Sequence, residues 1–244
     1  EGVDTAIAAA RAIGARVVRL GLSPVLSGDR AAQGERWPGM VAHAGRTLRE
    51  FAPRAAEHGL ALAIEDHQDF GSEELLGFCA EAGPNVGICL DTGNPLAVGE
   101  APAAFARKVA PMVRHVHLKD YRAQWTEEGY RLVRCAIGDG CVSFREIAAI
   151  LEEHHESLTA SLEPGALEAR HIRLFRESWW EGYPERSARE LAPALAAARV
   201  RRLEEDADWR TPWEAGAGPG TIIRYELEMI RRSMDNMRAL GLVP

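Results

Sequence analysis

Short apolar segments that alternate with helix-length segments constrain the fold of this chain more than any other feature of its sequence. Five segments have the length and composition of β-strands: 17–20, 60–65, 86–91, 113–118 and 158–163. Each follows a segment with apolar residues at helical spacing, at about 3–15, 40–57, 73–82, 101–109 and 144–154. Runs such as VGICL and LALAIE are apolar on both faces, which is typical of parallel strands covered by helices. An α/β protein with a parallel sheet is therefore expected.

Polar residues at the strand ends distinguish between two parallel architectures, an open doubly wound sheet and a (β/α)8 barrel. Glu65, Asp91, His117 and Glu163 each stand at or beside the C-terminal end of a different predicted strand. Side chains from the ends of many strands converge on one point only if the strands curve around it. The pattern therefore favours a TIM barrel with its site on the C-terminal face.

The nature of these four residues indicates a metal site. A carboxylate such as Glu65, at the end of a buried strand, must be paired, metal-bound or neutralised. A single strand-end glutamate is usually a surface or ion-paired residue, and His117 alone would fit a protein core, but four successive strands that end on possible ligands favour a shared ion. Three carboxylates and one imidazole suit Mn²⁺ best, with Mg²⁺, Co²⁺ or Zn²⁺ as alternatives.

Five short motifs, IEDH, CLDTGNP, HVHLKD, IGDG and SLEPG, occur in that order. They resemble the xylose isomerase-like TIM barrels of the sugar phosphate isomerase/epimerase family, over about residues 10–165. The resemblance implies that Glu65, Asp91, His117 and Glu163 bind one divalent ion. It also implies that Glu65 and Glu163 exchange protons with the substrate.

Further residues are expected around the substrate. The resemblance implies that His67 and Asn94 line the pocket, and the unperturbed pKa of a histidine, near 6.5, makes His67 an alternative catalytic base. Lys119 could neutralise a substrate oxyanion or form an ion pair with Asp120, and we favour the ion pair. Arg122 is expected in an irregular loop, where it would bind substrate as part of a lid.

Two departures from the family pattern concern the ends of the chain. By the family's layout Glu65 ends the fifth strand, so we expect that three N-terminal strands have been lost by truncation and that residues 1–165 form a partial barrel. Residues 166–244 form a charged, Trp-rich extension with helices expected at about 187–205 and 220–240. This extension is expected to pack on the barrel, on a second copy of the chain or on a partner subunit.

Composition excludes several classes of protein. A formal net charge of −7 and a pI near 5.7 disfavour binding to a nucleic-acid backbone. The longest apolar runs are too short for a membrane span. The four cysteines form no CxxC pair, so we expect reduced, mostly buried thiols in a cytoplasmic protein.

The predicted activity follows from the expected site. An ion that holds a ketone oxygen and a neighbouring hydroxyl acidifies the C–H between them, which favours a sugar isomerase or epimerase that works through an enediolate. A lyase on the same scaffold, such as a dehydratase or an enzyme that eliminates a group from a 3-oxo-glycoside, is the alternative. A DNA-repair endonuclease of the same superfamily would need further ligands and a basic face, which the net charge disfavours.

Overall fold

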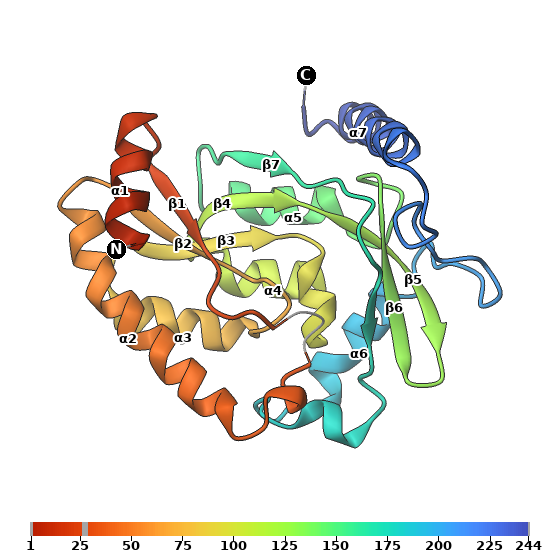
Figure 1. Ribbon diagram of the computed structural model, residues 1–244, viewed down its shortest axis with the longest axis horizontal. Coiled ribbons are helices and arrows are strands. Elements are labelled where there is room, and N and C mark those ends of the chain that lie inside the picture. Colours follow the sequence, from red (N-terminus) through yellow and green to blue (C-terminus); the bar gives the residue numbers. More distant parts are fainter. Residues whose placement is uncertain (1, 26–28, 244) are drawn as a thin grey trace.

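The computed structural model describes residues 2–25 and 29–243. Five parallel strands form a curled half-barrel in the order β1-β2-β3-β4-β7 (Figure 1). These strands are β1 (Val17–Leu20), β2 (Ala61–Glu65), β3 (Val86–Asp91), β4 (Val113–Leu118) and β7 (Ala160–Leu162). The helices that precede them are α1 (Gly2–Ala12), α2 (Arg36–Ala56), α3 (Ser72–Ala82), α4 (Pro102–Val109) and α5 (Phe144–Glu152). The predicted alternation of helices and parallel strands is confirmed.

The element boundaries differ from the prediction mainly at two places. Helix α2 begins at Arg36 rather than at residue 40, and the buried ring of Trp37 packs into the core from this additional turn. Strand β7 has three residues rather than six, and it pairs only with β4, at the edge of the sheet. Within the described residues, 3₁₀ helices connect the larger elements: η1 (Ala31–Gln33), η2 (Asn94–Val98), η3 (Ala110–Met112) and η4 (Glu177–Trp180).

The two faces of the parallel sheet differ in the size and polarity of their side chains. Side chains such as Leu62, Ile64 and Leu90 join one hydrophobic core with helices α2 to α5. Alternate side chains lie on the opposite, inner face, and these are small, as at Ala63, or polar. Runs such as LALAIE therefore combine an apolar outer face with a small-residue inner face, which hydrophobicity alone did not reveal.

A second, antiparallel sheet follows the half-barrel and corrects another expectation. Its strands are β5 (Asp120–Thr126), β6 (Gly129–Cys135) and β8 (Arg170–Ile172), in the order β5-β6-β8. The stretch expected to be an irregular loop is thus a hairpin, with Gly129 at the start of β6. A Cβ atom at Gly129 would lie 2.1 Å from the carbonyl oxygen of Ile172, so β8 can approach only a glycine there.

The last part of the chain packs against both sheets. Helix α6 (Ala188–Ala197) is shorter than expected, whereas α7 (Pro219–Leu240) begins one residue from the predicted start. In α7, Ser233 accepts a hydrogen bond from the Ile137 N–H (3.0 Å) and Asn236 donates one to the Ile137 carbonyl (2.8 Å). These bonds fix α7 beside the turn that follows β6.

Two further expectations can be compared with the structure. All four cysteines are free thiols, and Cys79, Cys89 and Cys141 are buried, as predicted. None of the described helices combines the length and the hydrophobicity that a bilayer span requires.

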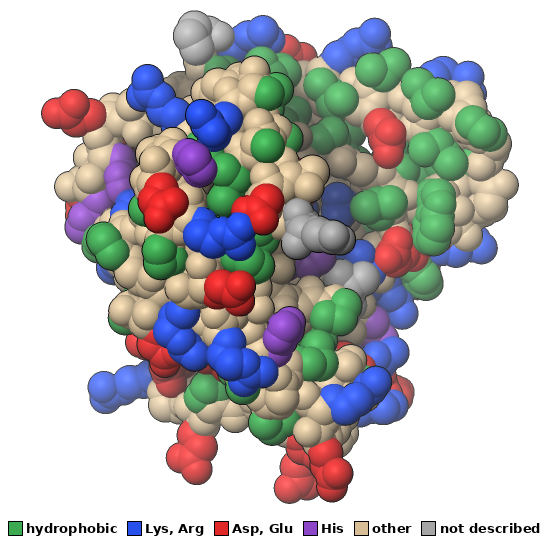
Figure 2. All heavy atoms as spheres, turned by 60° about the vertical axis from the view of Figure 1, so that its left-hand side comes forward, with side chains coloured by type: hydrophobic (Ala, Val, Ile, Leu, Met, Phe, Trp, Pro, Cys, Tyr) green, Lys and Arg blue, Asp and Glu red, His purple; other side chains and the backbone are tan. Residues whose placement is uncertain are grey.

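Figure 2 shows the side of the molecule where β1 lies, which is hollowed between two lobes and carries histidine and basic side chains in the hollow.

Candidate metal centre

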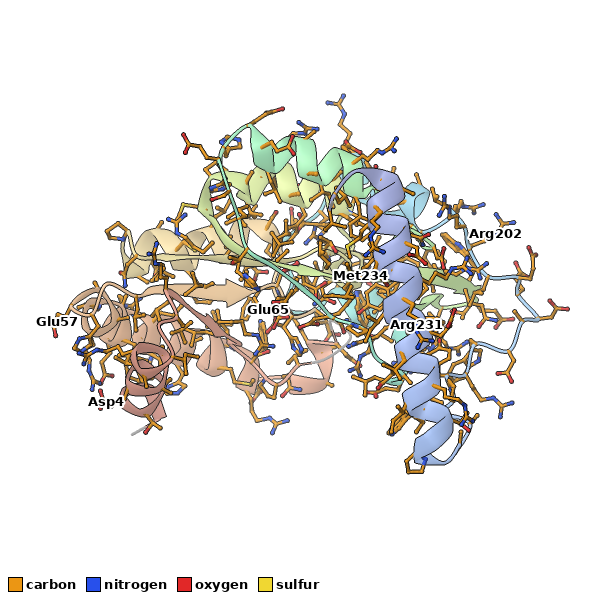
Figure 3. All side chains as sticks on the ribbon, turned by 90° about the horizontal axis from the view of Figure 1, so that it is seen from above. Asp4, Glu57, Glu65, Arg202, Arg231 and Met234 are labelled. Carbon is orange, nitrogen blue, oxygen red and sulfur yellow. The ribbon has the colours of Figure 1, made fainter. Side chains whose placement is uncertain are left out.

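The four predicted ligands come together at the carboxyl ends of the parallel strands. Glu65 is the last residue of β2 and Asp91 the last of β3, while His117 lies near the end of β4 and Glu163 directly follows β7. One ligand atom from each residue lies within 4.8 Å of those from the other three. In Figure 3, Glu65 lies near the middle of the molecule, where its strand ends. The curvature of the half-barrel thus achieves the convergence that the strand-end pattern predicted.

His117 stands between the two glutamates. Its Nδ1 atom lies 3.0 Å from Glu65 Oε1 and 2.8 Å from Glu163 Oε1. Burial lowers the pKa of His117, but its hydrogen bonds with Cys89, Glu163 and Glu65 outweigh this effect and raise the pKa to about 12. The hydrogen bond between His117 and Glu163, together with the positive charge of Lys119, holds the pKa of Glu163 well below its usual range.

Lys119 belongs to this group as well, and its expected ion pair with Asp120 is wrong. Its ammonium group contacts Asp91 Oδ2 and lies 2.9 Å from Glu163 Oε2. Asp120 instead accepts main-chain hydrogen bonds, including those from Gly138 and Gly140, both at 2.9 Å. Asp120 is the first residue of β5 and Lys119 directly precedes it, so their side chains point to opposite faces.

Two residues of the site were not predicted from the sequence. Arg19, on the inner face of β1, forms an ion pair with Glu65. Asp66 is buried and accepts a 2.6 Å hydrogen bond from the main-chain N–H of Asp91. Burial, reinforced by the Asp91 carboxylate, raises the pKa of Asp66 well above its usual value. The run of ionisable residues EDHQD was a sequence signal that could have identified Asp66. Nothing in the sequence identifies Arg19, because its pairing with Glu65 depends on the register between β1 and β2.

The structure places the expected substrate residues His67 and Asn94 next to the group. His67 is half-buried, and burial lowers its pKa although the charge of Glu65 opposes this. Asn94 is buried, and its main-chain N–H donates to Asp91 Oδ1 at 3.3 Å. Its Oδ1 accepts hydrogen bonds from Gln68 Nε2 (3.0 Å) and from the Tyr121 hydroxyl (3.2 Å).

Arg122, expected in a lid over the substrate, has its contacts elsewhere. It lies within β5, where its side chain and that of Tyr121 point to opposite faces of the hairpin. Its Nε donates to the carbonyl of Arg201 at 3.1 Å, and it lines a cavity beside α7. Its neighbour Tyr121, rather than Arg122, reaches the metal group through Asn94.

Burial differs among the four ligands and indicates where a substrate could enter. The side chains of Glu65 and Asp91 are fully buried, whereas that of Glu163 is 29% exposed. Glu163 is therefore the carboxylate of the group that a molecule from solution can reach most directly.

The donor set fits a divalent ion. Opposite ligands of an ion with metal–oxygen distances of 2.0 to 2.6 Å lie up to about 5 Å apart, which matches the separation in this group. Three carboxylates would repel one another here, and in the structure His117, Lys119 and Arg19 supply the compensating positive charges. Glu65, Asp91, His117 and Glu163 thus form a group that could hold a metal ion.

Comparison with known proteins identifies the family. A family model described as a xylose isomerase-like TIM barrel matches residues 1–178, which is most of the chain. The chain belongs to the xylose isomerase-like TIM barrel family. The predicted resemblance and the TIM-barrel fold class are therefore confirmed.

Two curated relatives of this TIM-barrel protein are enzymes by name. Inosose dehydratase from Clostridium beijerinckii is 30% identical over 125 residues, which cover 44% of this chain and 41% of that protein. 3-oxo-isoapionate decarboxylase from Pectobacterium atrosepticum is 25% identical over 147 residues, 58% of this chain and 48% of that protein. The chain thus spans less than half the length of these relatives.

A solved structure supports the fold. A xylose isomerase-like TIM barrel protein from Mycobacterium smegmatis, in complex with magnesium, superposes with a TM-score of 0.53 at 20% identity. The superposition covers 80% of this chain and 66% of that one. At this identity the similarity concerns the fold alone.

Proposed function

We propose that this protein is a divalent-metal-dependent isomerase or epimerase that acts on a keto sugar or a sugar derivative. The observation that carries the proposal is the convergence of three carboxylates and one imidazole from four strand ends. Family membership supports it, since the chain has the fold of the xylose isomerase-like family and one relative is by name a dehydratase of an inosose.

Glu65, Asp91, His117 and Glu163 would hold the ion, and Mn²⁺ is our first choice because most of the ligand atoms are oxygens. A bound ion would polarise a ketone oxygen and stabilise the negative charge that develops on it. His117 would bind through Nδ1, the nitrogen that faces both glutamates, and it would have to lose its proton to do so.

Glu163 is our candidate for the residue that takes a proton from the substrate carbon, because it is the most exposed carboxylate of the group. Glu65, in its protonated form, would then donate a different proton, to the same carbon in an epimerase or to the adjacent carbon in an isomerase, while Glu163 keeps the proton that it took. His67 is an alternative base, since it lies beside the group and burial favours its neutral form.

Two further residues would orient the substrate. Lys119 is held by Asp91 and Glu163, so its ammonium would lie close to an oxyanion that forms beside Glu163. Asn94 would contribute its amide, whose Nδ2 has no hydrogen-bond partner among the described residues. We also infer a cytoplasmic location from the four free thiols.

A lyase is the second candidate, and the names of the relatives favour it. The matched proteins are a dehydratase and a decarboxylase. Removal of a proton beside a ketone is a step that an isomerase and a dehydratase share. The two activities then differ in whether a proton returns or a neighbouring group departs.

Incubation in D₂O with Mn²⁺ and a panel of keto sugars, inososes and 3-oxo-glycosides tests both candidates. An isomerase or epimerase incorporates one deuterium into a rearranged sugar, whereas a lyase releases water or an aglycone. Glu163→Gln should lower the rate at least about 10³-fold, while Glu153→Gln, a change on the exposed end of α5, should leave it unchanged. Equal rates for wild type and Glu163→Gln would contradict the assigned role.

A further inference from the structure

A large cavity lies between the β5–β6 hairpin and α7. Its volume is about 590 Å³, within the range that small-molecule sites occupy. The hairpin contributes Arg122 and Cys135 to its wall. None of the four residues of the metal group is among the described residues that line it.

One face of α7 forms the opposite wall. Tyr225, Met229 and Arg232 line the cavity, and their spacing of three and four residues places them on the same side of the helix. Figure 3 shows how α7 runs along this side of the molecule, with Arg231 labelled on it. The cavity is therefore bounded by two regular elements rather than by loops alone.

Some of the charged side chains around the cavity have ion-pair partners and others do not. Asp139 forms an ion pair with Arg232, and Glu228 lies 3.8 Å from Arg231. Among the ion pairs of the described residues, none involves Arg122 or Arg201, the two other arginines of the wall. Two positive charges thus face the cavity without a carboxylate partner.

Main-chain carbonyl groups hold these two arginines in place. Arg122 Nε donates to the carbonyl of Arg201 at 3.1 Å, and Arg201 donates to the carbonyl of Gly138. Arg201 has a φ of 49°, in the left-handed region that few residues other than glycine adopt. Backbone strain of this kind is concentrated at binding and catalytic sites.

We propose that this cavity is a second small-molecule site, which binds a phosphate-bearing molecule through Arg122 and Arg201. A guanidinium group has five N–H donors, and the hydrogen bonds to the carbonyls of Arg201 and Gly138 use only part of those of Arg122 and Arg201. Two planar guanidinium groups suit a phosphate, which has several oxygens to share between them. The proposal does not depend on the activity proposed for the metal group.

The rest of the ligand would have room beside the phosphate. A neighbouring cavity of about 200 Å³ shares Arg122, Cys135 and Tyr225 with the first and adds Trp209 and Thr211 to the wall. Aromatic rings and a hydroxyl group are suited to the organic part of a phosphorylated metabolite.

Calorimetric titration of the chain with inorganic phosphate tests the proposal. EDTA is present throughout, so that no bound divalent ion can attract the phosphate, and chloride at equal ionic strength corrects for screening. We expect saturable binding at one site per chain, weakened at least about tenfold in Arg122→Gln and in Arg201→Gln. Arg224→Gln, a change at an exposed position of α7 that does not line the cavity, is the matched control and should bind like the wild type.

Several results would overturn the proposal. Absence of saturable binding to the wild type would do so, as would unchanged binding in both cavity variants. An equal loss in Arg224→Gln would show that the helix surface attracts phosphate by general electrostatics. Thermal unfolding of each variant confirms that it is folded, and since Arg201 is exposed, Arg201→Gln decides the question if Arg122→Gln does not fold.

Discussion

The outer and inner faces of the half-barrel belong to the same strands but have opposite roles. On the outer face, Ile64, Ile88 and Leu90 are completely buried against the helices. On the inner face, the intervening positions carry Glu65 and Asp91, which are also buried but need compensating charges. Alternate residues of one strand therefore contribute stability on one side and a reactive group on the other.

This difference predicts how substitutions on each face should affect the stability of the protein. Apolar contacts on the outer face stabilise the fold whatever is bound to the site. The inner face collects like charges whose repulsion is relieved by Arg19, His117 and Lys119, or by a metal ion. Substitutions on the two faces should thus respond differently to a divalent ion.

The largest loss of stability is expected from the outer face. Ile88→Ala removes a fully buried side chain, leaves a cavity and should lower the free energy of unfolding by about 4 kcal/mol. Chemical denaturation with EDTA and with Mn²⁺ measures this. The loss of stability should be the same in both conditions. A loss that Mn²⁺ reverses would contradict the claim that the outer face stabilises the fold independently of the metal site.

Loss of Lys119 should be nearly as large but should depend on the ion. Lys119→Met leaves Asp91 and Glu163 without their shared cation, which should cost about 3 kcal/mol in EDTA. Mn²⁺ should restore more stability to this variant than to the wild type, because the ion replaces the missing charge. Lys108→Met, at a more exposed lysine, is the control and should change stability by less than about 1 kcal/mol.

The pKa values of Asp69 and Glu163 are shifted in opposite directions, upward for Asp69 and downward for Glu163. The carboxylate of Asp69 accepts hydrogen bonds from the Ser23 hydroxyl (2.7 Å) and the Phe70 N–H (3.0 Å). Burial raises its pKa from 3.8 to about 6, so the folded state holds this proton more tightly than the unfolded chain does. The stability that the folded protein gains from holding this proton is fully present below pH 3.8 and is lost as the pH rises through about 6.

The variant Asp69→Asn isolates this effect. Between pH 3.8 and 6, the wild type should lose about 2 kcal/mol of stability relative to Asp69→Asn. Denaturation curves at half-unit pH intervals measure the difference. A constant difference between the two proteins over this range would contradict the raised pKa.

The smallest effect is expected from His115, on the inner face of β4. Its ring nitrogens lie 2.7 Å from Thr159 Oγ1 and 2.9 Å from Ser161 Oγ, but these contacts are exposed to solvent. His115→Ala should cost less than about 1 kcal/mol, whereas Val116→Ala, at the neighbouring buried position, should cost about 2 kcal/mol. Thermal unfolding of the pair compares adjacent residues on opposite faces, and the reverse order would contradict the assignment of the faces.

The sequence predicted the half-barrel and its strand ends because both depend on local pattern. Periodicity located the helices, and polar residues after apolar runs located Glu65, Asp91 and Glu163. Parallel pairing then brought these ends together, as the fold class implied.

Other features depend on contacts between distant residues, and the sequence did not reveal them. Arg19 reaches Glu65 only because β1 and β2 pair in one particular register. The hairpin β5–β6 was expected to be a loop, and so Arg122 was expected over the site, whereas its neighbour Tyr121 points that way. The positions of α6 and α7 follow from packing against both sheets, which no local pattern encodes.

Metal content, measured by mass spectrometry after dialysis against Mn²⁺, tests the central claim most directly. The wild type should hold one ion per chain, and Glu163→Gln and His117→Ala should lose it while Glu153→Gln keeps it. A folded wild-type protein that binds no divalent ion, or site variants that bind it as well as the wild type does, would contradict the claim that the four strand ends form a metal centre.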